Sequence, residues 1–96
     1  MPPLRQLTES ERAAWERAVE MAREQLPLPA RSSLDYLDPV GIQDGEGNSG
    51  RILWIRVRAG AGSAAIRLAQ SGTLRRALYE AFGEIIDPVP IREESP

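Results

Sequence analysis

The spacing of apolar residues predicts two helices in the first part of the chain. From residue 9 to 25 apolar side chains recur every three or four positions, which is typical of a helix with one buried face. Thr8 and Glu11 fit a capping box at the start of this helix. A short second helix is expected in the segment 28–38, because Pro39 disfavours helical backbone at the residue before it.

Alternating apolar and polar residues predict three strands. The segments 40–44 and 51–58 read as strands joined by a turn at 45–50, where glycine and asparagine are frequent. The last strand is expected at 85–91. It contains two prolines, which cannot donate a backbone hydrogen bond, and we therefore place it at an edge of the sheet.

A third helical pattern at 63–83 separates the last two strands, and Gly72 is expected to kink or split that helix. The predicted order is therefore α-α-β-β-α-β. This order indicates an α+β fold with one three-stranded sheet packed by helices. We expect a single domain at 8–91, with a flexible N-terminus at 1–7 and a disordered tail at 92–96.

Composition excludes most catalytic chemistry. The 96 residues include no cysteine, no histidine and no lysine, so all twelve basic residues are arginine. Thiolate and imidazole metal sites, disulfides, Ser–His or Cys nucleophiles and Schiff-base lysines are therefore excluded. We predict a binding module that is not an enzyme and uses no cofactor or metal. The chain has no apolar run long enough for a membrane span and no signal-peptide pattern, so a cytoplasmic location is expected.

The net charge of −2 is the sum of three unlike segments. Residues 1–50 carry five arginines and nine acidic residues, residues 51–83 carry six arginines and one, and residues 84–96 carry one arginine and four. Positive charge is therefore concentrated in the predicted hairpin strand and the helix after it. Such a patch is a candidate contact for nucleic acid or for an acidic protein surface.

Trp54 is expected on the same strand face as Arg56 and Arg58. Single-stranded nucleic acid can use this combination, because bases stack on aromatic rings while guanidinium groups contact phosphates. The alternative is structural: the arginines pair across the sheet with Asp44 or Glu84, and the indole covers the edge of the core. The candidate nucleic-acid residues are Arg51, Trp54, Arg56, Arg58 and Arg67.

Trp15 lies on the apolar face of the first predicted helix. Its simplest role is to fill the core. At the outer edge of the apolar stripe it could instead pack against a second copy of the chain, in a weak homodimer.

The order and spacing of motifs resemble two bacterial replication families. Trp15 opens a helix, Leu26-Pro27 follows it, and Tyr36-Leu37-Asp38-Pro39 ends a short helix, a succession that resembles the N-terminal domain of the replication initiator DnaA. The hairpin and the segment 66–78 resemble that family's second strand and long helix. The segment 50–57 and the helix after it are also similar to DciA, a stand-alone helicase loader or operator.

These resemblances imply a KH-like fold and a role in replication initiation. The implied function is a non-enzymatic module that binds the replicative helicase, of the DnaB type, and contacts single-stranded DNA. In the DnaA family the second helix and the start of the long helix form the helicase-binding surface. By position, this surface would contain Ala30, Arg31, Ser33 and Ile66. Together with Trp15, these residues are the expected protein-interaction set. Both families tend to place an aromatic residue early in the long helix, where this chain has alanines.

Two functions of other classes stay open at this point. One is a KH-like RNA-binding module, whose RNA affinity would depend steeply on salt. The other is a structural homodimerisation domain.

Overall fold

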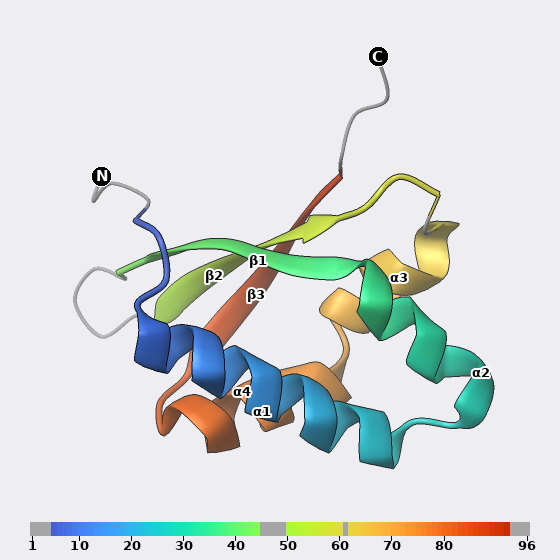
Figure 1. Ribbon diagram of the computed structural model, residues 1–96, viewed down its shortest axis with the longest axis horizontal. Helices are drawn as coiled ribbons and strands as arrows, with labels where there is room; N and C mark the ends of the chain where they lie inside the picture. Colours follow the sequence, from blue (N-terminus) through green and yellow to red (C-terminus); the bar gives the residue numbers. More distant parts are fainter. Residues whose placement is uncertain (1–4, 45–49, 61, 93–96) are drawn as a thin grey trace.

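The chain folds into a three-stranded sheet with its helices gathered on one side (Figure 1). The computed structural model describes residues 5–44, 50–60 and 62–92, so most of the predicted turn and tail, and residues 1–4, lie outside the described residues. The elements are α1 (Glu9–Gln25), α2 (Leu28–Arg31), the 3-10 helix η1 (Ser32–Tyr36), β1 (Leu37–Gln43), β2 (Arg51–Val57), α3 (Gly62–Ala69), α4 (Gly72–Phe82) and β3 (Ile86–Arg92).

This arrangement confirms the predicted α+β class and the order of helices and strands. The third helical pattern divides into α3 and α4, the split that Gly72 suggested. Ser71 causes the new start, because its hydroxyl accepts a hydrogen bond from the Leu74 amide at 3.3 Å and caps α4. At the other end of α4, Gly83 takes a positive φ of 74° and terminates the helix.

Strand β2 is central, antiparallel to β1 and parallel to β3. The edge position predicted for the last strand is confirmed. Pro88 and Pro90 are two residues apart, so their nitrogens face the same side of β3, which is the side away from β2. β1 begins earlier than the sequence suggested, at Leu37, and contains a register shift between Pro39 and Gly41.

Residues 5–7, which the sequence places in a flexible N-terminus, contact the domain, and residues 1–4 of that segment lie outside the described residues. Arg5 pairs with Ile42 on the outer edge of β1, where the Arg5 amide donates to the Ile42 carbonyl at 3.0 Å and the Ile42 amide donates back at 2.8 Å. Leu7 is buried in the core. The segment before α1 is too short to show a helical or strand periodicity, so the sequence contains no signal for this contact.

The core fills the space between the sheet and the helices. Leu53 and Ile55 of β2 are fully buried on the inner face of the sheet. α1 packs against α4, and Ala18 and Ala22 of α1 are fully buried in the core. Trp15 belongs to this core with only 6% of its surface exposed, so the indole has little surface left for a partner.

Replacing Trp15 with alanine is expected to lower the free energy of unfolding by about 3–5 kcal/mol, because it removes a large buried ring. Urea unfolding followed by circular dichroism measures this loss, and sedimentation of the native protein measures the oligomeric state. A loss below about 1 kcal/mol, accompanied by conversion of a dimer to a monomer, would contradict the core role of Trp15.

Candidate functional site

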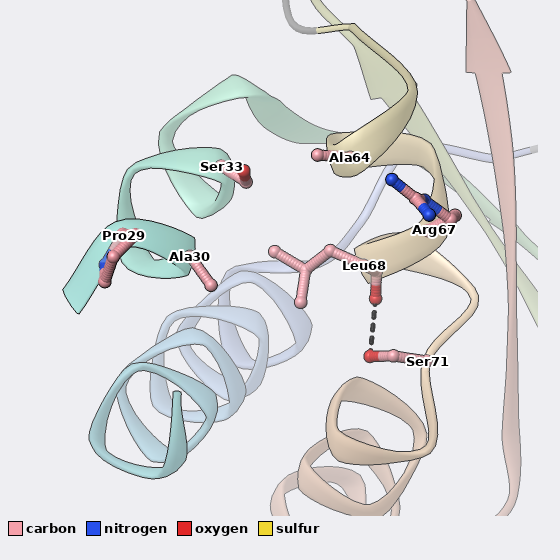
Figure 2. Close-up of a pocket in the computed structure, with 7 residues that line it drawn as sticks. All are labelled: Pro29, Ala30, Ser33, Ala64, Arg67, Leu68 and Ser71. Carbon is pink, nitrogen blue, oxygen red and sulfur yellow. Dashed lines mark hydrogen bonds between the residues drawn. The ribbon is translucent and has the colours of Figure 1, made fainter. Parts of the chain in front are cut away.

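A groove with a volume of about 440 Å³ separates α2 and η1 from α3 and the start of α4 (Figure 2). One wall consists of Pro29, Ala30 and Ser33. The facing wall consists of Ala64, Arg67, Leu68 and Ser71. We call this feature the α2–α3 groove.

Buried anchors and caps hold both walls in place. Leu34 fixes η1 because its side chain is almost fully buried in the core. The Nε of Arg31 donates to the carbonyl of Leu26, the residue that follows α1, at 3.0 Å, which ties α2 to the end of α1. On the other wall, the fully buried Ala65 and Ala69 attach α3 to the core. The α3 wall is therefore anchored in the core by two buried alanines, while the α2 wall is held through the neighbouring Leu34 and the Arg31 hydrogen bond.

The lining is mainly apolar. Leu68 extends between the helices toward Ala30, as Figure 2 shows. The hydroxyl of Ser71 donates to the Leu68 carbonyl at 2.7 Å, so its hydrogen is used within the chain. Among the described residues no carboxylate lines the groove, and Arg67 is the one charged residue of the lining. An apolar side chain of a partner could bury itself here without displacing an internal ion pair.

The groove brings together three residues predicted from the sequence for two different roles. Ala30 and Ser33 come from the expected protein-interaction set, and Arg67 comes from the expected nucleic-acid set. Ile66 is partly buried and packs against the core, and the guanidinium of Arg31 donates to the Leu26 carbonyl at the end of α1. Neither residue lines the groove.

Sequence reasoning missed four of the lining residues, namely Pro29, Ala64, Leu68 and Ser71. A signal for part of this set existed. Ala64 and Leu68 are four residues apart with Arg67 beside them, and this spacing places all three on neighbouring faces of one helix.

The outer face of the sheet is a second candidate surface, which we call the open sheet face. Trp54 lies on it half-buried, opposite Gly41 of β1 and beside Val89 of β3. Its indole nitrogen donates to the Gln43 side-chain oxygen at 3.3 Å. Part of its role is structural, because an aromatic ring beside a glycine replaces the missing cross-strand side chain.

Arg56 and Arg58 share one carboxylate, that of Asp38. Arg58 donates to both Asp38 oxygens, at 2.7 and 3.1 Å, and Arg56 donates at 3.4 Å. The hydrogen bond from Arg58 is the main cause that lowers the pKa of Asp38. The pairing partners suggested by the sequence, Asp44 and Glu84, are wrong, because the β1–β2 register places Asp38 directly opposite Arg56.

Arg51 lies at the other end of β2, away from Trp54 and Arg56. Its guanidinium is 3.1 Å from Glu11, 3.3 Å from Asp44 and 3.0 Å from Glu84. This ion-pair cluster joins α1, both strands of the hairpin and the segment before β3. Arg51 is therefore at the opposite end of β2 from Arg56, and Arg67 belongs to α3, so neither lies beside Trp54 and Arg56.

Arg5 completes the same cluster through Glu11. Its guanidinium donates to the two Glu11 carboxylate oxygens at 2.7 and 2.9 Å. The hydrogen bond from Arg5 is the largest of the causes that lower the pKa of Glu11 to about 2, and the Thr8 amide also donates to this carboxylate. With 11% of its side chain exposed and its pKa lowered to about 2, Glu11 stays ionised well into the acidic range.

Within the described ranges, no group of acidic residues is arranged to hold a metal ion. In the same part of the chain, no helix has the length and apolar character needed to cross a membrane.

The Glu11 cluster predicts a pH dependence of stability. A carboxylate whose pKa is lowered on folding stabilises the native state above its unfolded pKa, and this contribution is lost as the pH falls toward 2. We expect Glu11→Gln to lower the free energy of unfolding by on the order of 2–3 kcal/mol at neutral pH. Between pH 5 and about 2 the difference from the parent protein is expected to shrink.

Urea titrations at several pH values measure this difference. Glu16→Gln, a change at an exposed position on the same helix, serves as the matched control and is expected to have little effect. A difference between Glu11→Gln and the parent that stays constant from pH 7 to pH 2 would contradict the role of the ionised Glu11 carboxylate.

Comparisons of the chain with protein-family models, with curated proteins and with solved structures find no match.

Proposed function

We propose that this chain is a non-enzymatic interaction module that docks a segment of a partner protein in the α2–α3 groove, and that the partner is the replicative helicase. One observation carries the proposal. The resemblance to the DnaA family assigns helicase binding to the second helix and to the start of the long helix, and in this fold those two segments are the two walls of one groove.

The physical character of the groove supports protein docking. The α3 wall is anchored in the core through Ala65 and Ala69, so binding would not have to order that wall first, and this lowers the cost of association. An amphipathic helix of a partner could place its apolar face against Leu68 and Ala64, as in other helix-in-groove complexes. The exposed side chain of Leu28, next to Pro29, extends the apolar surface beyond the groove.

Filling the groove is expected to abolish docking. Ala64 is exposed on α3, so Ala64→Trp places a large ring over the groove without disturbing the core. We expect at least a roughly tenfold weaker affinity for the replicative helicase of the source organism, measured by calorimetry.

The matched control is Ala13→Trp, the same change at an exposed position of α1, which is expected to bind like the parent. The proposal fails if the parent forms no complex at tens of micromolar, or if both variants bind equally well.

A second function is favoured by the open sheet face. There Trp54 and the half-exposed Arg56 lie on one side of β2, and stacking on an indole with a phosphate held by a guanidinium is a common mode of binding single-stranded nucleic acid. For a replication module the ligand is single-stranded DNA. For the alternative KH-like module it is RNA.

Arg56→Ala is expected to weaken binding of oligo(dT) by several-fold and to reduce its salt dependence, because one phosphate contact is lost. Fluorescence anisotropy measures the affinity, and oligo(U) in parallel distinguishes the RNA-binding alternative. Arg76→Ala removes an exposed arginine of α4 and serves as the control. Equal effects of the two variants would assign the binding to general charge and not to this face.

A further inference from the structure

We infer that the α2–α3 groove selects a partner segment that carries a carboxylate next to an apolar anchor side chain. This inference rests on the proposed docking function and adds the chemistry of the segment that docks. It follows from the charge around the groove, whose lining is apolar apart from two serine hydroxyls and the guanidinium of Arg67.

Arg67 differs from the arginines of the sheet. Arg51 faces three carboxylates, and Arg56 and Arg58 share Asp38. Across residues 5–44, 50–60 and 62–92, in contrast, no carboxylate lies within ion-pairing distance of the exposed Arg67. A partner carboxylate could therefore pair with this guanidinium without breaking an existing ion pair.

A second arginine, next to the opposite wall but not among the residues that line the groove, has the same property. Arg31 follows Ala30, and its Nε is bound to the neutral Leu26 carbonyl. No carboxylate of the described chain pairs with it. Among the described residues, the guanidinium of Arg67 in the groove and that of Arg31 beside it thus have no ion-paired carboxylate, on a chain whose total charge is −2. A segment with acidic residues fits this local field, and a basic segment is repelled by it.

The apolar part of the groove defines the anchor. Ala64 and Leu68 are one helical turn apart on α3, and Ala30 faces them from α2 (Figure 2). A volume of about 440 Å³ lies within the range of pockets that hold small ligands. We expect the partner to be a helix with two apolar side chains one turn apart and a glutamate or aspartate one turn further on, beside Arg67.

Two synthetic helical peptides test this chemistry directly. Both carry two leucines one turn apart, and they differ only in having glutamate or glutamine one turn further on. Binding is followed through the NMR amide signals of Ala64 and Leu68. We expect the glutamate peptide to bind roughly threefold or more tightly than the glutamine peptide.

Variants at Arg67 establish whether the preference arises there. Arg67→Glu is expected to remove or reverse the preference for the glutamate peptide, and Arg67→Lys is expected to retain most of it. The control is Arg76→Glu, the same charge change at an exposed position of α4, which is expected to leave the preference unchanged.

The outcomes separate this inference from the proposed function. If both peptides shift the groove signals with equal affinity, the carboxylate preference is overturned while docking in the groove stands. If neither peptide shifts those signals, the inference is overturned, and the helicase assay with Ala64→Trp decides the proposed function by itself. Self-association in sedimentation that Ala64→Trp abolishes would identify a second copy as the occupant and would overturn the choice of a partner protein.

Discussion

The burial of one face of β2 determines where the other elements lie. Leu53, Ile55 and Val57 need an apolar cover, and the helices supply it from one side of the sheet. Because successive strand residues point to opposite faces, the same constraint turns Trp54 and Arg56 outward. Both candidate surfaces follow from this asymmetry: the open sheet face is the side without helices, and the α2–α3 groove lies where the covering helices fail to meet.

Features that depend on local patterns could be predicted from the sequence. The capping box at Thr8 and Glu11 gave the start of α1, because both hydrogen bonds lie within one turn. Gly72 indicated the break in the third helical pattern, and two prolines indicated that β3 is an edge strand. The core position of Trp15 followed from its place on an apolar stripe. These features together were sufficient for the fold class.

Features that depend on register or on distant segments could not be predicted. The register shift between Pro39 and Gly41 affects which β1 residue lies opposite Arg56. The alternation of apolar and polar residues therefore could not predict that Arg56 pairs with Asp38 and not with Asp44. The α2–α3 groove combines residues 29–33 with residues 64–71, which are adjacent only after folding. Whether an arginine has an ion-pair partner likewise depends on the tertiary structure. Arg51 and Arg67 belong to the same basic segment, but only Arg51 forms ion pairs among the described residues.

The backbone at the two edges of the sheet limits where a strand of another molecule can pair with this protein. On the outer side of β3, two prolines leave positions without an N–H, so an incoming strand would find no continuous ladder of donors. On β1, the backbone of Arg5 already occupies the groups of Ile42. Extension of the sheet by strand addition, and the edge-to-edge aggregation that follows the same route, are therefore disfavoured at these positions. At these positions a partner would have to be recognised through side chains and not by strand addition.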